Sequence, residues 1–298
     1  MPEAATSHEP EPRAETVPDA AALPEHCSGS SGRRLPLLRS LRFDPFGLMG
    51  VVIVVFLWWA LSQVLSPSIL PPPIAVAQRI GRDFFVARVL SFYGLPETGL
   101  LSSMLYTATN VVGSVFVGGL IGTVCGLISA RVPLVRAIID PILTTVGTIP
   151  ILVLAPFFLI WFGTGRVGGL LLITIYVVVI LYVYAQRAAD NLDPVYEDNA
   201  RTLGATGRAI LREILVPGTL PQILGGIRIA LAGAWGLEAI AELLGAQEGI
   251  GKIVEVLAGS LDNEGIFACL VVLGLVAVVT DALTGAAVRH ATRWKADS

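Results

Sequence analysis

The chain has 298 residues, of which 54% are hydrophobic and 14% are charged, and its formal net charge is −3. Soluble domains carry about a quarter charged residues, so this composition indicates a membrane protein. The small net charge implies neither a basic surface for nucleic acid nor a strongly acidic body. Apolar runs of spanning length alternate with short polar joints, which is typical of a polytopic α-helical membrane protein and not of an outer-membrane barrel. Cys27, Cys125 and Cys269 are far apart and lack metal-ligand spacing, so no metal site or disulfide framework is expected.

Residues 1–44 are expected to be a disordered cytoplasmic tail. This segment is rich in Pro, Glu, Ala and Ser and has no apolar core, which excludes a signal peptide. It ends in a basic patch formed by Arg33, Arg34, Arg39 and Arg42. A membrane domain over residues 45–288 and a short cytoplasmic tail over residues 289–298 are expected to follow.

Six membrane spans are predicted from the apolar runs. Their approximate ranges are 46–65, 102–129, 134–162, 167–184, 220–244 and 266–288. Prolines after the first span break any helix there, and residues 74–88 and 90–98 then predict a short amphipathic helix and a loop. Asp140-Pro141 is expected to start the helix of the third span, and Pro150 to kink or break it.

Small residues mark the second span as a helix-packing surface. Gly118, Gly119 and Gly122 are expected to contact a neighbouring helix, because glycines let backbones approach closely in lipid. Lys and Arg are more frequent in the joints on the N-terminal side of the membrane, which predicts that both termini and residues 190–217 are cytoplasmic.

Residues 190–217 form a polar cassette between the fourth and fifth spans. Asp193-Pro194 predicts a helix start, and Gly204 a left-handed helix end near Leu203. Thr206 is expected to cap a second short helix that Pro217 stops. The cassette is therefore predicted to be two short helices joined by a glycine turn.

The second helix of the cassette is amphipathic. Its apolar side holds Ile210, Leu211, Ile214 and Leu215. Arg208 and Arg212 share the polar face and repel each other by about 0.2–0.5 kcal/mol, which an acidic partner surface would reverse. Helix geometry alone favours an interfacial helix at the lipid headgroups, while a DNA-binding helix-turn-helix has too little basic surface.

The spacing within the cassette resembles the cytoplasmic "EAA" loop of permease subunits of binding-protein-dependent ABC importers. That pattern is Glu-Ala-Ala, three residues, Gly, nine residues and Ile-x-Leu-Pro. Gly204, Ile214 and Pro217 are in register, and Asp198 and Ala200 stand at the first and third positions of the triplet. This sequence departs from the pattern at Asn199 and Val216.

Four other segments resemble the nitrate/sulfonate/taurine subgroup of the same family, so that the resemblance covers about residues 45–288. They are "SILPPP" (68–73), "IPILVLAPFFLIWFGTG" (149–165), "LPQILGGIRIALAGAW" (220–235) and "AELLGAQEGIGKIV" (241–254).

The resemblance implies an all-α polytopic membrane protein of about six transmembrane helices with the type I ABC importer permease fold, in the bacterial plasma (inner) membrane. The implied solute is a small anion such as a sulfonate, taurine or nitrate. The implied partners are two copies of an ATPase subunit, an extracytoplasmic solute-binding protein, a second permease subunit in a homodimer, and the lipid bilayer, with no nucleic acid. The chain lacks a Gly-x-x-x-x-Gly-Lys-Ser/Thr loop, so ATP and Mg are expected on the ATPase, and neither a cofactor nor enzymatic activity on this chain. The implied ATPase-coupling residues are Asp198, Ala200, Gly204, Ala205, Arg208, Arg212, Ile214 and Pro217.

Two acids in the fifth span are candidates for the translocation pathway. Glu238 and Glu242 lie four residues apart on one helical face, and intramembrane acids usually face a cavity or a partner. Glu242 can instead bond the following loop, and a structural role is favoured for Glu238. Trp235 and Pro150 are further pathway candidates, with packing as the alternative for Trp235.

Three hypotheses therefore follow from the sequence. The first is the importer subunit. The second is an ion-coupled secondary transporter or channel that uses Glu238, Glu242 and Asp281. The third is a membrane scaffold whose cassette only recruits a cytoplasmic protein.

Overall fold

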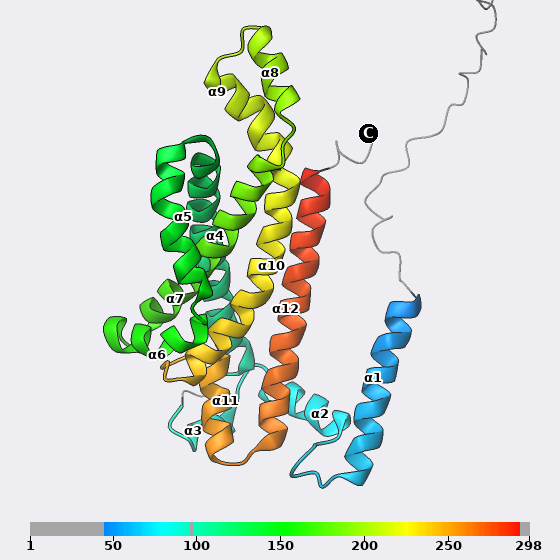
Figure 1. Ribbon diagram of the computed structural model, residues 1–298. Coiled ribbons are helices and arrows are strands. Elements are labelled where there is room, and N and C mark those ends of the chain that lie inside the picture. The colour runs from blue at the N-terminus through cyan, green and yellow to red at the C-terminus, as the bar shows by residue number, and fades with distance from the viewer. Residues whose placement is uncertain (1–44, 96–97, 293–298) are drawn as a thin grey trace, which may run out of the picture. The chain divides into compact units, whose positions relative to one another are not determined.

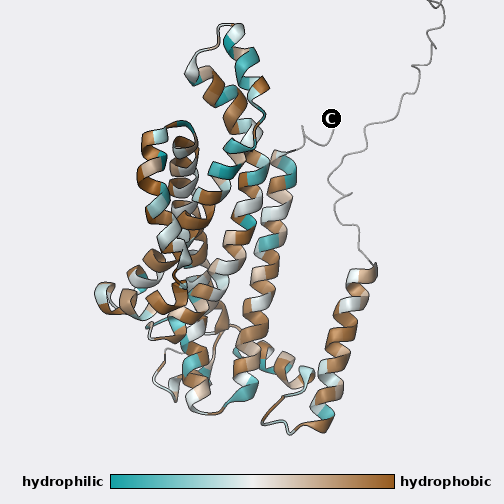
Figure 2. Ribbon diagram, viewed as in Figure 1, coloured by the Kyte–Doolittle hydropathy of each residue, from teal (hydrophilic) through white to brown (hydrophobic). Residues whose placement is uncertain are grey.

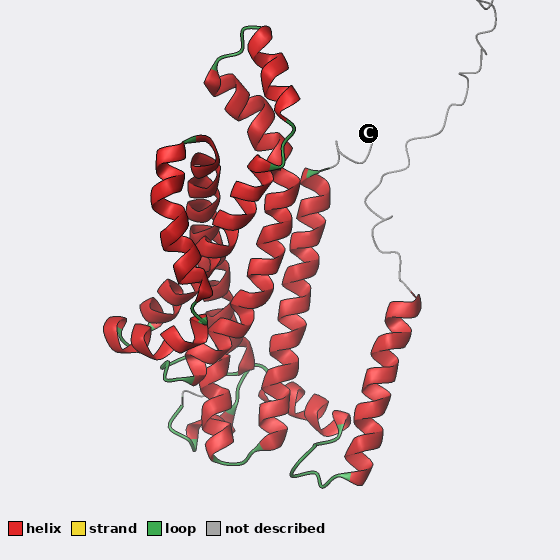
Figure 3. Ribbon diagram, in the orientation of Figure 1, coloured by secondary structure: helices red, strands yellow, loops and turns green. Residues whose placement is uncertain are grey.

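The structure is a computed structural model that describes residues 45–95 and 98–292. The predicted tail over residues 1–44 and the part of the C-terminal tail from residue 293 lie outside the described residues. The chain divides after Met49 into two units, and the second, from Gly50 onwards, contains the helical bundle described below. Apart from one antiparallel bridge between Val86 and Thr98, the regular structure of the described residues is helical (Figure 3).

The helices of the six spans and of the cassette occur in the predicted order, and the structure adds others between them. They are α1 (Pro45–Val64), α2 (Pro73–Asp83), α3 (Arg88–Ser91), α4 (Leu100–Arg131), α5 (Pro133–Thr148), α6 (Ile151–Phe162), α7 (Arg166–Asp190), α8 (Pro194–Thr202), α9 (Gly207–Ala209), the π-helix η2 (Ile210–Leu215), α10 (Val216–Leu243), α11 (Ile250–Gly259) and α12 (Asn263–Ala291). Among the described residues, 5 helices are long and apolar enough to cross a membrane, and the bent pair α5–α6 raises this number to 6. The predicted all-α fold with about six spans is confirmed.

Helices α4, α7, α10 and α12 pack side by side along their length (Figure 1). The hairpin of α8 and α9 projects beyond one end of this bundle, which we call the cassette end, while α2, α3 and α11 lie at the opposite end. The long helices are largely hydrophobic, and hydrophilic residues gather in the hairpin and at the helix ends (Figure 2).

The predicted break in the third span is confirmed at Pro150. Helices α5 and α6 meet there at 98°. Ile149 is extended, with φ −76° and ψ 125°, as expected of a residue that precedes proline. Because Pro150 also lacks an N–H, the helical ladder stops and restarts at this point.

The expectation that Asp140-Pro141 starts the helix of the third span is wrong. Helix α5 begins at Pro133, eight residues earlier, and Pro141 lies inside it. A proline at the first helical position costs nothing, because that N–H has no intrahelical acceptor. Pro133 therefore provides the helix start that was expected at Pro141.

The expectation that Pro217 stops the second cassette helix is also wrong. Residues Gly207–Leu243 form one continuous helix of 37 residues. Ile210–Leu215 is wound as a π-helix, in which Val216 donates its N–H to the carbonyl of Leu211. This wider turn shifts the hydrogen-bond register just before Pro217, so that the proline enters at the start of α10 without breaking the helix.

The region after the fifth span was predicted only in part. Helix α11 follows Gly249, whose φ of 107° favours glycine, and it was not foreseen from the sequence. The amphipathic helix predicted over residues 74–88 is present as α2 but ends at Asp83, and the short α3 reaches into the segment expected to be a loop.

The glycines of α4 form the contact with α7, as predicted. Figure 1 shows these two helices against each other. A Cβ atom added at Gly118, Gly122 or Gly126 would lie 2.7, 2.6 or 2.5 Å from a backbone carbonyl oxygen of α7. At Gly119, which was also expected to take part, an added Cβ would make an ordinary contact of 3.5 Å with Leu181. The close approach therefore depends on every fourth residue being glycine.

Substituting Gly122→Ala is expected to destabilise the bundle by about 1–3 kcal/mol, because the added methyl group meets the backbone of Val178 and not a movable side chain. The measurement is the unfolding midpoint of the purified protein in detergent. The matched control is Gly274→Ala on α12, where an added Cβ has no neighbour within 4 Å and stability is expected to be unchanged or slightly raised. Equal midpoints for the two variants would contradict the close α4–α7 contact.

Candidate functional site

The cassette is a helical hairpin with the predicted capping. The Asp193 carboxylate accepts the N–H of Val195 at 3.0 Å and thereby caps α8. Gly204 has φ +81°, the left-handed conformation that ends the helix, and the N–H of Ala205 donates to the carbonyl of Ala200 at 2.9 Å. The hairpin turn is therefore fixed by backbone bonds between two of the residues that the resemblance singled out.

The hairpin presents a mixed apolar and basic surface. Asp198, Gly204, Arg208 and Arg212 are exposed, whereas Ala200, Ala205, Ile214 and Pro217 are half-buried. Of the predicted apolar side of the second helix, Ile210 and Leu215 are buried, but Leu211 is exposed. Leu203, at the tip, is 88% exposed, and Val195 and Tyr196 are also exposed. An exposed apolar patch next to arginines is typical of a docking surface.

Glu242 joins three helices at the opposite end of the bundle. Its carboxylate is buried and accepts the hydroxyl of Thr107 on α4 at 2.7 Å and the N–H of Gly251 on α11 at 2.8 Å. The Thr107 oxygen in turn accepts the N–H of Ile250 at 3.1 Å. Glu242 therefore bonds the segment that follows its helix, which was one of the two predicted alternatives.

Glu238 lies one turn deeper and is also buried. One of its carboxylate oxygens accepts the amide of Asn110 at 2.6 Å, and the oxygen of that amide accepts Arg166 Nε at 2.5 Å. The other oxygen, Oε2, is buried without a hydrogen-bond partner among the described residues. A cavity of about 10 Å³ lies beside it, between Tyr106, Asn110 and Arg166, which is the space of about one water molecule.

The other two pathway candidates lie in different surroundings. Trp235 is buried in the main apolar core, and its indole N–H donates to Thr280 on α12 at 3.0 Å, which is the packing role that the sequence left open. Pro150 is exposed at the break between α5 and α6. The structure thus brings the two glutamates together but gives Trp235 and Pro150 separate structural positions.

An ion pair between α10 and α12 was not foreseen. Arg228 holds the carboxylate of Asp281 in a bidentate contact, with Nε–Oδ1 at 2.9 Å and Nη2–Oδ2 at 2.6 Å. The two side chains are 44% and 45% exposed. Arg228 and Asp281 lie at similar depths from the cassette ends of two antiparallel helices, and this matching depth is the sequence signal that could have paired them.

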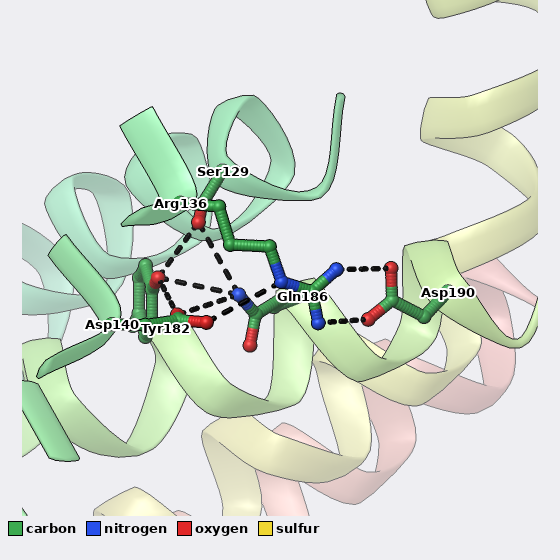
Figure 4. A network of polar contacts seen from close by, with 6 residues as sticks. All are labelled: Ser129, Arg136, Asp140, Tyr182, Gln186 and Asp190. Atoms are coloured by element: carbon green, nitrogen blue, oxygen red, sulfur yellow. Dashed lines mark hydrogen bonds and ion pairs between the residues drawn. The ribbon is translucent and has the colours of Figure 1, made fainter. Parts of the chain in front are cut away.

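A polar network near the cassette end was also missed. It joins α4, α5 and α7 around Asp140 and comprises Ser129, Arg136, Asp140, Tyr182, Gln186 and Asp190 (Figure 4). Asp140, expected only to mark a helix start, accepts bonds from Tyr182 and from Gln186. No pattern within one helix could have revealed a contact that needs three helices.

The fold and these sites define a multi-pass helical membrane protein with one exposed hairpin, and comparison with known proteins gives its family. Residues 118–293 match the family described as the binding-protein-dependent transport system inner membrane component.

The chain is 28% identical over 263 residues to the taurine transport system permease protein TauC of Escherichia coli (strain K12). The aligned residues make up 88% of this chain and 92% of that protein. It is 25% identical over 252 residues to the putative aliphatic sulfonates transport permease protein SsuC of Bacillus subtilis (strain 168), covering 84% and 87%. It is 30% identical over 239 residues to the formylaminopyrimidine transport permease protein ThiX of Halalkalibacterium halodurans, covering 78% and 88%. A chain of the MetNI methionine ABC transporter in an inward-facing conformation has a similar fold, with a TM-score of 0.58 at 22% identity, covering 65% of this chain and 96% of that one.

The chain belongs to the family of binding-protein-dependent transport system inner membrane components. It is the permease component of a binding-protein-dependent ABC importer and a multi-pass protein of the bacterial inner membrane. The predicted family is confirmed. ATP is bound and hydrolysed by a separate ATPase subunit, and a solute-binding protein is the other partner class.

Replacing Glu242 by alanine is expected to destabilise the end of the bundle opposite the cassette. The buried N–H of Gly251 loses its acceptor, which costs about 1–3 kcal/mol, and the cavity left by the side chain adds to this loss. The measurement is the unfolding midpoint in detergent together with amide exchange of α11. The matched control is Glu248→Ala, an exposed acid in the segment between α10 and α11, which is expected to change little. Equal unfolding midpoints and equal amide exchange of α11 in the two variants would show that Glu242 does not hold α11.

Proposed function

We propose that this permease imports a small organic solute that carries a sulfonate group, and that taurine or an alkanesulfonate is a better candidate than nitrate. The observation that carries this proposal is the similarity to the taurine permease TauC over 88% of the chain, together with the similarity to SsuC. The formylaminopyrimidine permease ThiX is as similar in sequence but matches a shorter part of the chain, so its solute is the competing candidate.

The hairpin over residues 190–217 is proposed to dock on the ATPase subunit through Asp198, Ala200, Gly204, Ala205, Arg208, Arg212, Ile214 and Pro217. Its exposed apolar tip and the arginines beside it fit a protein partner with an apolar groove and acidic rim. Because Gly207–Leu243 is one continuous helix, a force on the hairpin reaches the membrane without an intervening flexible joint. This is the mechanical requirement for alternating access driven by a separate ATPase.

The face that carries Arg228 and Asp281 is proposed to meet a second copy of the chain along the solute pathway. An ion pair exposed to hydrocarbon costs several kcal/mol, so charged side chains within spans usually face a cavity or a protein partner. Along α10 the exposed Ala232 and Gly236 leave this face flat enough for another helix to approach. The proposed assembly is a homodimer with residues 45–288 as the membrane domain of each copy. Its termini and hairpin are proposed to be cytoplasmic, which is supported by the excess of Lys and Arg in the joints on that side.

Glu238 and Glu242 are proposed to close the outer end of that pathway as a gate. Both carboxylates are buried and bonded to α4, which removes the conflict between two acids and an anionic solute. Trp235 fixes α10 on α12 beside this gate, and Pro150 sets the 98° bend between α5 and α6. The ion-coupled alternative is not retained, because Asp281 is paired with Arg228 and the family is that of ABC importers.

Uptake of radiolabelled taurine into proteoliposomes that hold the permease and its ATPase is expected to require both internal ATP and the external binding protein. The control is the same vesicle with a catalytically inactive ATPase. Transport of a formylaminopyrimidine but not of taurine or an alkanesulfonate would refute the solute class. Uptake that persists without the ATPase and collapses with an ion gradient would refute ATP-driven import.

Charge and polarity changes on the hairpin are expected to release the ATPase subunit. Leu203→Asp and Arg208→Glu should each lower co-purification of the ATPase by about tenfold or more, because they place acids on an apolar and on a basic part of the proposed contact. Arg289→Glu, an exposed change of charge on α12, is the matched control and should leave co-purification unchanged. Full retention of the ATPase by both hairpin variants would exclude this docking surface.

A further inference from the structure

Helix α5 contacts the rest of the bundle without burying any of its own side chains. Its apolar residues Leu134, Ile138 and Ile142 are all more than half exposed. Burial of apolar side chains therefore contributes little to its position. Polar contacts to α7 hold α5 in place, and the α7 side chains that make two of them are also bonded to Ser129 near the end of α4.

The contacts of α5 converge on two of its side chains. Arg136 binds Asp190 in a bidentate contact, with Nη1–Oδ1 at 3.2 Å and Nη2–Oδ2 at 3.0 Å, and its Nε also approaches Asp140 at 3.3 Å (Figure 4). Asp140 accepts Gln186 Nε2 at 2.7 Å and the hydroxyl of Tyr182.

Tyr182 and Gln186 also bond Ser129 on α4, at 2.7 and 3.2 Å. Three helices thus share one polar cluster. The cluster fixes the position of α5 in both distance and direction.

The cluster is continuous with the base of the hairpin. Asp190 is the last residue of α7, and Asp193, the cap of α8, follows three residues later. A second ion pair joins Arg131, the last residue of α4, to Glu197 on α8, which Arg201 also approaches at 3.7 Å. Arg131 of α4 therefore holds the first arm of the hairpin, and Arg136 of α5 holds the end of α7 that leads into it.

The geometry points to Arg136 and Arg131 as positioning residues that transmit displacement of the hairpin to α5 and α4. Bidentate arginine–carboxylate contacts define direction as well as distance, whereas half-exposed pairs add little to stability, so a geometric role fits Arg136 better than a stabilising one. This inference rests on the proposed docking of the ATPase at the hairpin.

Helix α5 can carry such a displacement towards the opposite end of the bundle. It continues across the 98° bend into α6, whose Ala155 and Phe158 pack in one apolar cluster with Leu172 and Ala241. Ala241 precedes Glu242, the carboxylate that holds α4 and α11. A continuous series of contacts thus runs from the hairpin through Arg136, α5 and α6 to the proposed gate.

The test uses charge reversal in the complete complex with ATPase and binding protein. The variants are Arg136→Asp, Asp190→Arg and the double exchange Arg136→Asp/Asp190→Arg, with Arg289→Asp as a control that removes an arginine at the same end. Each single reversal is expected to lower ATP-driven uptake at least tenfold while the ATPase still co-purifies in the normal ratio. The double exchange should recover most of the uptake, because the pair forms again with its charges interchanged.

A second measurement does not depend on the solute. Spin labels at Ile138→Cys on α5 and Leu275→Cys on α12, both exposed sites, report the distance between these helices in a chain whose native cysteines are replaced by serine. ATP is expected to shift this distance in the labelled complex that keeps Arg136 and Asp190 and in the labelled double exchange. No shift is expected in the labelled single reversals.

The inference is overturned if the single reversals keep their uptake or the ATP-dependent distance change, if the double exchange fails to restore them, or if co-purification of the ATPase falls in parallel. It is also overturned if ATP moves no label in a complex that transports solute. A chain that never binds the ATPase would instead refute the proposed function, and the co-purification measurement identifies that case.

Discussion

The close approach of α4 and α7 is the contact on which the rest of the structure depends. In lipid, apolar side chains gain little by meeting each other, so helices associate where small residues let their backbones touch. The glycines at 118, 122 and 126 place α4 directly against carbonyl oxygens of α7. The last of them, Gly126, faces Tyr182, and Ser129 one turn further along bonds the hydroxyl of the same tyrosine. The packing that joins the two helices therefore also assembles the polar cluster that holds α5.

Prolines show how far the sequence could define the helices. Pro150 was correctly predicted as a break because the residue before a proline avoids the helical conformation and the ladder loses a donor. Pro217 was expected to act in the same way but does not, because the π-helical turn before it absorbs the missing bond. A π-turn has no simple sequence pattern, since it depends on how the flanking helices are packed. The difference matters for the proposed function, because it makes the second arm of the hairpin and α10 one continuous helix.

The spans, the hairpin and its caps could be predicted from the sequence because each depends on residues a few positions apart. Hydrophobic length, Asp193 and Gly204 are local signals of this kind. The partners of charged side chains could not be predicted in the same way. Asp140 finds Gln186, and Arg228 finds Asp281, across more than 40 residues of sequence, and these pairs exist only once three or four helices have packed. For Glu242 the sequence supplied the right residue and left two roles open, and only the position of α11 shows which group it bonds.

The two ends of the bundle are held by contacts of different strength, which gives a direction to any motion. At the cassette end, Arg136 and Asp190 are paired while both remain accessible to water. Breaking this ion pair and hydrating its two side chains therefore changes the free energy little. At the opposite end, the carboxylates of Glu238 and Glu242 are buried, and loss of a single partner leaves an unpaired polar group away from water, which costs about 1–3 kcal/mol or more. A force applied at the hairpin is therefore expected to rearrange the cassette-end contacts first, while the opposite end stays closed. Opening of the proposed gate requires an additional source of free energy, and in an importer this can come from the ATPase and from the binding protein.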